Sequence, residues 1–375
     1  MQKHLDIVAG DLLYANPYPA DRAIHAYYSR IVEIQPDELL CVYRRASALY
    51  GDDGRSWVLR SVDGGASWNG EGCLYDGSDD DRPYSYSATN LTRMSGGEIV
   101  VIGHRFHRPS PDMPMYDVET GGHLPEQPLL FRSRDDGRTW SGPQLIEKPD
   151  EHMIHYDSIT ELADGRWFVT IDWDRTYDER YGLPPHVSGL FSDDRGKTWG
   201  NCVQLTGGPN DEKGYWHTRV TKLSDGRLIA FPWTGSIDST SFHTLHRIEG
   251  SPDAMQWKPP QPTKLQAQTN RPVAMGDGYV ALIMSVRESD QPGIYMALSD
   301  DEGATWDTDH WVRVWDAYGQ DSLGVPRTDK YPAAHDTIAF GAPDAIRLSD
   351  GDIMASFWAG QRGQMVVRWV RLRMV

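Results

Sequence analysis

The chain has 375 residues and a formal net charge of −17, which argues against a general nucleic-acid or anionic-membrane surface, because such a surface needs basic patches. Its 14 Trp, 18 Tyr, 36 Gly and 24 Pro favour short strands and many turns over long helices. No segment approaches about 18 apolar residues, and the N-terminal stretch lacks an apolar run of signal-peptide length. We therefore expect a soluble, cytoplasmic protein with no nucleic-acid or membrane partner.

Six hairpins follow one another along the chain, each an apolar strand, a tight turn and a second apolar strand. They begin near residues 30, 90, 158, 219, 271 and 344. A second hairpin follows each of the first five. Four-stranded sheets of this kind cannot bury both faces alone, so six of them predict blades stacked around an axis. An N-terminal strand near "HLDIVAG" is expected to complete the sixth blade. Residues 1–375 are thus predicted to form one all-β domain, a six-bladed β-propeller.

An octet of the form S-x-D-x-G-x-x-W lies at the turn of four of the second hairpins. The copies are "SVDGGASW" at 61–68, "SRDDGRTW" at 133–140, "SDDRGKTW" at 192–199 and "SDDEGATW" at 299–306, with a degenerate "SPDAMQW" at 251–257. The aspartate can accept hydrogen bonds from backbone N–H groups of its own turn, and the tryptophan can pack back between blades. We interpret the octets as scaffolding.

These octets resemble the Asp-box (BNR) repeats of the sialidase superfamily, over roughly residues 25–370. The resemblance implies Asp-box turns on the propeller rim, away from the active site. The segment "YSRIVEI" resembles the family's F/Y-R-I-P-x-L segment, which places Arg30 on its first carboxylate-binding arginine, although Val32 replaces the proline. The acid/base aspartate of the family then corresponds to Asp52 or Asp53 in "GDDG" at 51–54.

The remaining sialidase residues are missing from the pattern. The expected glutamate base is replaced by His217 or Tyr156, the second arginine by Trp233 or Asp172, and the tyrosine nucleophile by Ala342. The resemblance therefore predicts the fold more firmly than it predicts sialidase activity.

The hairpins also predict which residues face the central funnel, where each innermost strand begins and its partner strand ends. At one repeat-equivalent position stand Arg30, Asn90, Ser158, Arg219, Arg271 and Asp344. Two residues earlier stand Tyr28, Ala88, Tyr156, His217, Thr269 and Ala342, and the partner strands end at Arg45, His104, Asp172, Trp233, Ser285 and Trp358. Guanidinium groups bind carboxylates bidentately, so three arginines at one position predict an acidic sugar as ligand. The candidate substrate-binding residues are Arg30, Arg45, His104, Arg105, Arg219, Arg271, Trp233, His335 and Asp336.

Three functions remain open for this funnel. A sialidase-like glycoside hydrolase needs a proton donor and an opposing carboxylate, for which the candidates are Asp52 or Asp53 together with Asp157, Asp172 or Asp336. A uronate-type lyase would pair arginine with a proton-abstracting His or Tyr, here His104, His217 or Tyr156. A non-catalytic carbohydrate-binding or interaction propeller is the third possibility. The substrate that we expect is a small, carboxylate-bearing carbohydrate.

We expect neither a cofactor nor a metal ion. The histidines of the 104–128 insertion, His104, His107 and His123, match no compact ligand set. The three cysteines likewise have no metal-ligand spacing.

Overall fold

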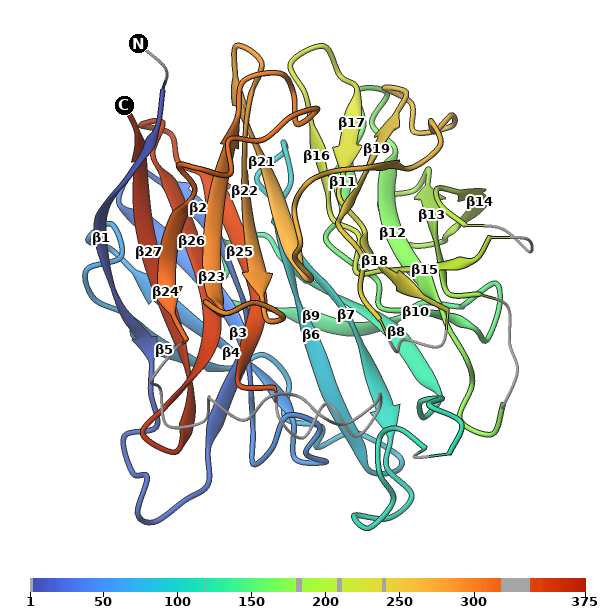
Figure 1. The fold of residues 1–375 in the computed structure, drawn as a ribbon. Coiled ribbons are helices and arrows are strands. Elements are labelled where there is room, and N and C mark those ends of the chain that lie inside the picture. The colour runs from blue at the N-terminus through green and yellow to red at the C-terminus, as the bar shows by residue number, and fades with distance from the viewer. Residues whose placement is uncertain (1–2, 118, 180–183, 208–210, 238–240, 318–337) are drawn as a thin grey trace.

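A computed structural model describes residues 3–375 with the exception of 118, 180–183, 208–210, 238–240 and 318–337. Within these residues the chain forms strands and turns without a helix, and hence without a helix able to cross a membrane (Figure 1). The sheets are arranged as six blades of a propeller. The predicted all-β, six-bladed fold is confirmed.

Blades 1, 2 and 5 are regular antiparallel meanders, each running from the axis outward in chain order. Blade 1 comprises β2 (His25–Gln35), β3 (Glu38–Ala46), β4 (Arg55–Ser61) and β5 (Asn69–Cys73). Blade 2 comprises β6 (Tyr84–Arg93), β7 (Ile99–His107), β8 (Glu126–Ser133) and β9 (Ser141–Leu145). Blade 5 comprises β21 (Asn270–Gly276), β22 (Tyr279–Val286), β23 (Gly293–Ser299) and β24 (Val312–Asp316).

Blades 3 and 4 have interrupted inner strands. In blade 3, β10 (Met153–Ile154) and β11 (Thr160–Glu161) both pair with β12 (Trp167–Trp173), which continues into β13 (His186–Ser192) and β14 (Gly200–Gln204). In blade 4, β15 (Lys213–Trp216) pairs with β18 (Trp233–Ser236), while β16 (Val220–Lys222), β17 (Leu228–Ala230), β19 (His246–Gly250) and β20 (Gln261–Pro262) form the main sheet. The two interruptions fall at residues 155–159 and 217–219, which lie at the central cavity described below.

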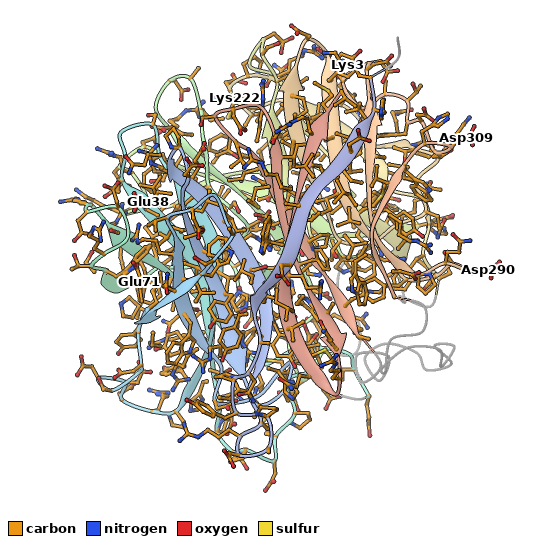
Figure 2. All side chains as sticks on the ribbon, turned by 90° about the vertical axis from the view of Figure 1, so that its left-hand side faces the viewer. Lys3, Glu38, Glu71, Lys222, Asp290 and Asp309 are labelled. Carbon is orange, nitrogen blue, oxygen red and sulfur yellow. The ribbon has the colours of Figure 1, made fainter. Side chains whose placement is uncertain are left out.

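Blade 6 joins the two ends of the described chain. Its strands are β25 (Phe340–Arg347), β26 (Ile353–Gln361), β27 (Gln364–Met374) and, outermost, β1 (Leu5–Tyr14). β1 pairs antiparallel with β27, with Leu5 opposite Met374. Figure 2 looks directly onto β1, which runs along the outer edge of the blade. The ring is thus closed by backbone hydrogen bonds between segments far apart in the sequence.

Apolar side chains between adjacent blades form the core. One cluster joins Leu40 and Val42 of β3 to Leu91 of β6 and Val101 of β7, and equivalent clusters lie between the other blades. Strand residues that alternate between the two faces of a blade contribute to the clusters on both sides. Every blade is therefore covered on both faces, as the stacking of six sheets requires.

The Asp-box turns satisfy their own hydrogen bonds. In the first copy, Asp63 Oδ1 accepts from the Ser61 hydroxyl at 2.8 Å and from the Ser67 N–H at 2.9 Å, and Trp68 Nε1 donates to the Gly65 carbonyl at 3.0 Å. The carboxylates of Asp135, Asp194 and Asp301 accept from their own turns in the same way. Ser61 lies opposite Leu39, at the far end of β3 from the cavity residue Arg44, so these turns belong to the opposite end of the blade.

Candidate functional site

A cavity of about 200 Å³ opens at the axis, with walls from all six blades. The described residues in its walls include three imidazoles and many aromatic rings. They also include five arginines, Arg30, Arg44, Arg175, Arg219 and Arg287, and two aspartates, Asp157 and Asp174. The predicted funnel is therefore polar, aromatic and rich in positive charge.

Backbone irregularities aim side chains at this cavity. Tyr28, His155, His217 and Ala342 have positive φ angles of 52, 51, 49 and 43°. Each stands two residues before a charged axial residue, namely Arg30, Asp157, Arg219 and Asp344. In blades 1 and 6, two residues of the inner strand lie opposite one residue of the partner strand. Such a β-bulge changes the direction of the side chains that follow it. A left-handed residue other than glycine costs about 1–3 kcal/mol, and outside tight turns such residues cluster at functional sites.

The three predicted arginines converge at the axis and share two carboxylates. Arg219 Nε donates to Asp157 Oδ2 at 3.1 Å. Asp344 Oδ1 lies 3.6 Å from Arg30 Nε and 3.7 Å from Arg271 Nε. Arg30 and Arg219 are cavity walls, whereas Arg271 is not and contacts Asp344.

Burial and mutual repulsion affect the ionisation of these groups. Burial, together with the nearby charge of Arg219, lowers the pKa of Arg30 to about 10, although Asp344 and Asp157 act in the opposite direction. Burial also disfavours the ionised form of Asp157, but Arg219, Arg30 and Arg271 outweigh it and lower the pKa of that carboxyl. Arg30 and Asp157 are therefore both charged near neutral pH.

In blade 3 the prediction was wrong by one residue. Asp157, not Ser158, contacts Arg219. His155 and Tyr156 both border the cavity, but it is the His155 ring that contacts the cavity residue His217, whereas the Tyr156 hydroxyl is buried. Five residues separate β10 from β11, against three between β15 and β16, and this longer interruption shifts the alignment. The side chain of Tyr156 is fully buried in the core between blades 2 and 3, so its predicted catalytic role is not supported.

The partner strands required a similar correction. The guanidinium of Arg45 lies 4.0 Å from the ring of Trp57, outside the cavity, while Arg44 lines the wall. Arg105 forms an ion pair with Asp80 at 2.9 Å, again outside the cavity walls, while the adjacent His104 is one of them. Successive residues of a strand face opposite sides, so neither predicted substrate-binding arginine reaches the ligand space.

The first-blade aspartates do not reach the cavity either. Asp53 accepts the Ser47 N–H at 3.0 Å and the Ser47 hydroxyl at 3.0 Å, which closes its own loop. Neither Asp52 nor Asp53 is a cavity wall, and the loop contributes Leu49 and Tyr50 instead. His335 and Asp336 lie outside the described residues.

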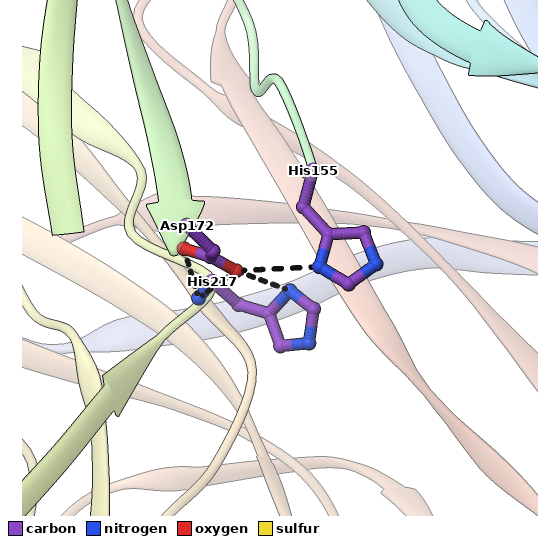
Figure 3. A group of neighbouring side chains, drawn as sticks. All are labelled: His155, Asp172 and His217. Atoms are coloured by element: carbon purple, nitrogen blue, oxygen red, sulfur yellow. Dashed lines mark hydrogen bonds and ion pairs between the residues drawn. The ribbon is translucent and has the colours of Figure 1, made fainter. Parts of the chain in front are cut away.

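Two cavity histidines share one buried carboxylate (Figure 3). Asp172, at the end of β12, accepts the backbone N–H of His217 with Oδ1 at 3.1 Å and Oδ2 at 3.0 Å. Its Oδ2 also lies 3.4 Å from Nδ1 of His155 and 3.5 Å from Nδ1 of His217. The indole of Trp233, a predicted binding residue, stacks on the His217 ring, with 5.8 Å between the ring centroids. Asp172 is 2% exposed and is not itself a cavity wall. Its contacts therefore orient the two imidazoles that line the cavity.

The two imidazoles have opposite pKa shifts. Burial lowers the pKa of His217 to about 4, although Asp172 acts in the opposite direction. Burial also disfavours the charged form of His155, but Asp172 and Glu126 outweigh it and raise its pKa to about 9.

Sequence reasoning missed two acids near this group, the buried Glu126 and the partly exposed Asp174. Glu126, at the start of β8, accepts the His155 N–H at 3.0 Å, and burial raises its pKa to about 7. Asp174 lines the cavity beside Arg175, and burial raises its pKa. The one signal for Glu126 was a carboxylate at the head of an otherwise apolar strand.

A family model described as a BNR repeat-like domain matches residues 107–354. The chain belongs to the BNR repeat-like family. This BNR repeat-like protein is similar in structure to a protein of unknown function from Dyadobacter fermentans, with a TM-score of 0.74, 16% identity and 99% of each chain covered. No curated protein sequence matches it.

Structures of carbohydrate-active enzymes are similar to this BNR repeat-like protein as well. The Hadza microbial sialidase Hz136 has a TM-score of 0.63 and 16% identity over 92% of this chain and 65% of its own. The Penicillium chrysogenum α-L-arabinanase complexed with arabinobiose has a TM-score of 0.60 and 13% identity over 97% of this chain and 98% of its own. At these identities the similarity shows the fold, and together with the family model it confirms the predicted six-bladed propeller of BNR repeats.

Proposed function

We propose that the protein is a sialidase-like glycoside hydrolase that acts on a carboxylate-bearing sugar or oligosaccharide bound in the axial cavity. The observation that carries this proposal is the charge of the cavity. Its described walls hold five arginines and two aspartates, in a chain whose net charge is −17. Such a local reversal of sign favours an anionic ligand.

Neutral acceptors hold some of this positive charge in place. Arg44 donates to the carbonyl oxygens of Tyr86 at 3.0 Å, Leu49 at 2.7 Å and Gly51 at 2.9 Å. A carbonyl oxygen positions a guanidinium without neutralising it, so the cavity keeps a positive potential that a ligand carboxylate would offset.

The aromatic walls suit a sugar. Tyr28, Trp216 and Trp233 border the space, and their rings offer flat apolar faces with a polar atom at the edge. Solved structures of the same fold include a sialidase and an arabinanase complexed with arabinobiose, which supports a carbohydrate as the ligand.

For hydrolysis we assign the two cavity carboxylates, Asp157 and Asp174. One would donate a proton to the leaving oxygen, and the other would attack the anomeric carbon or activate water. Both belong to the interrupted third blade, which brings them to the same mouth. Asp52 and Asp53 are replaced in this role because the structure keeps them outside the cavity.

One observation favours a lyase as the second candidate: His155 and His217 line the cavity beside Arg219. In that reaction Arg219 would neutralise a uronate carboxylate, and an imidazole would remove the α-proton. The C–O bond to the leaving sugar then breaks, its oxygen takes up a proton, and a double bond forms in the uronate. No water is consumed.

Product analysis distinguishes these reactions. Oligosaccharides ending in a sialic or uronic acid, and matched neutral ones, would be incubated with the protein and analysed by mass spectrometry. Hydrolysis adds the mass of water, whereas elimination gives an unsaturated product without it. We expect Asp157→Asn and Asp174→Asn to reduce hydrolysis by roughly a hundredfold or more, and the exposed-residue control Asp290→Asn to have no effect. Preference for the neutral substrates, or unaltered turnover in both cavity variants, would contradict the proposal.

A further inference from the structure

We propose that His155, Asp172 and His217 together form a binding site for one divalent transition-metal ion, with Zn²⁺ as the best-suited ion, in the wall of the axial cavity. This proposal does not depend on the identity of the sugar or on bond cleavage. It concerns three side chains that sequence spacing could not bring together, because they come from three separate segments of the chain.

The spacing of the three ligand atoms fits a shared ion. Both Nδ1 atoms face the same oxygen, Asp172 Oδ2, at 3.4 and 3.5 Å, and the ligand atoms of all three residues lie within 4.8 Å of one another. Ligands placed ~2.1 Å from a tetrahedral ion stand ~3.4 Å apart. Direct hydrogen bonds between charged partners are shorter, about 2.7–2.9 Å. Figure 3 shows the two rings converging on the carboxylate from neighbouring segments.

A second observation points to a missing ligand. Nδ1 of His155 is buried and makes no hydrogen bond of normal geometry within the described part of the chain. The contact of this nitrogen with Asp172 Oδ2, at 3.4 Å, is longer than a good charged hydrogen bond and satisfies the buried group only in part. An ion that displaced the imidazole proton would bind the nitrogen directly and remove the cost of this incomplete pairing.

The surroundings hold the three groups in place. The backbone N–H of His217 binds both oxygens of Asp172, and Trp233 stacks on the His217 ring. His155 and His217 both have left-handed backbone, at φ 51 and 49°, in the interrupted inner strands of adjacent blades. Such outer contacts orient metal ligands, and strained backbone at two of the three positions is what a functional site would retain.

The ligand set also indicates the class of ion. Two imidazoles and one carboxylate suit Zn²⁺, and similar sets hold Fe²⁺, whereas Ca²⁺ and Mg²⁺ prefer oxygen ligands. Three protein ligands leave at least one coordination position, and both imidazoles belong to the cavity wall. A bound ion would therefore present its open position to the space beside Arg219.

Metal binding can be measured without any sugar. Protein purified, stripped with a chelator and dialysed would be titrated with Zn²⁺ alone by calorimetry, and its metal content determined after reloading. We expect one ion per chain and a Co²⁺-loaded form with the intense visible bands of a low-symmetry site. His155→Ala and His217→Ala should each weaken Zn²⁺ affinity by roughly a hundredfold or more.

The rim supplies a matched control. His310 and Asp307 form an exposed pair at 2.8 Å, and His310→Ala should leave the stoichiometry and affinity unchanged. If a cavity variant fails to fold, the wild-type protein still tests the proposal. An ion that binds the native state must raise its unfolding temperature, which is measured with and without Zn²⁺. No uptake by the wild type, equal loss in His310→Ala, or wild-type affinity in both folded cavity variants would overturn the proposal. Sugar turnover by metal-free protein would leave the proposed function intact.

Discussion

At the scale of single residues, the axial charges are the most informative feature. Arg30, Arg219 and Arg271 share the carboxylates of Asp157 and Asp344, so the group carries more positive than negative charge. We predict that Arg30→Ala weakens binding of an acidic sugar by about 2–5 kcal/mol, because it removes one partner of a buried charge pair, with much less effect on a neutral analogue. Calorimetry with the two sugars measures the difference.

Arg45 provides the control for this experiment. It is fifteen positions along in the same blade, but its guanidinium lies over Tyr14 and Trp57 outside the cavity. Arg45→Ala should leave binding of both sugars unchanged. Equal losses for acidic and neutral sugars in the Arg30 variant would contradict the prediction.

Tyr156 tests the correction made in blade 3. Its hydroxyl is buried without a hydrogen-bond partner in the described structure. Tyr156→Phe should therefore leave turnover unchanged and keep or raise stability, by up to about 1–3 kcal/mol, since an unsatisfied polar group is removed. Urea unfolding and the product assay together check this. A folded variant with lost turnover would restore the catalytic role that the sequence suggested.

The errors of sequence reasoning at this scale have one cause. The sequence predicted Arg45 where the structure has Arg44, and Tyr156 where it has His155. Both errors are of a single position. A strand side chain changes face at every residue, and a bulge changes the count without any mark in the sequence. Residue types were predicted well enough to name Arg30, Arg219, Asp157 and His217, but their direction depends on backbone irregularities that only the structure shows.

At the scale of elements, the Asp-box turns make a pH-dependent contribution. Hydrogen bonds from Ser67 and Ser61 lower the pKa of Asp63 from 3.8 to about 2, and equivalent turns lower those of Asp135 and Asp194 to about 2. Since the folded pKa lies below the unfolded value, this stabilisation is complete above pH 3.8 and is lost as pH falls toward 2. We predict a decline in the free energy of unfolding across that window.

Urea titrations at a series of pH values measure this decline. The variant Asp63→Asn should show a shallower one, since one of the titrating turns is gone, while turnover per folded molecule stays unchanged. An identical pH profile in the variant, or a loss of turnover without a loss of stability, would argue against a scaffolding role.

The elements themselves were largely predictable. Each hairpin combined an apolar alternation with a Gly- or Asp-containing turn, and these local signals survive in the folded protein. The interruptions of the inner strands in blades 3 and 4 were not predictable, because residues 155–159 and 217–219 contain no Gly or Pro to mark a break. His155 and His217 keep a left-handed backbone that only the surrounding structure can fix, a contribution that no short segment reveals.

At the scale of the whole molecule, six repeats were enough to predict the ring. Its closure can be tested by removing residues 1–14, which takes away β1 and leaves β27 as an open edge. We expect a lower unfolding temperature and concentration-dependent association, because an unpaired strand edge can pair with another chain. Thermal unfolding and size-exclusion chromatography at several concentrations measure both. A monomer as stable as the full chain would show that β1 contributes nothing.

The same closure has a consequence for biosynthesis. β1 is made roughly 350 residues before its partner β27, so at about 5–20 residues per second β1 waits for roughly twenty seconds to over a minute. In the finished fold only Leu5 and Leu13 of β1 are buried. Little apolar burial is therefore lost during that wait, and the composition of the strand suits a segment that must remain unpaired until β27 has been translated.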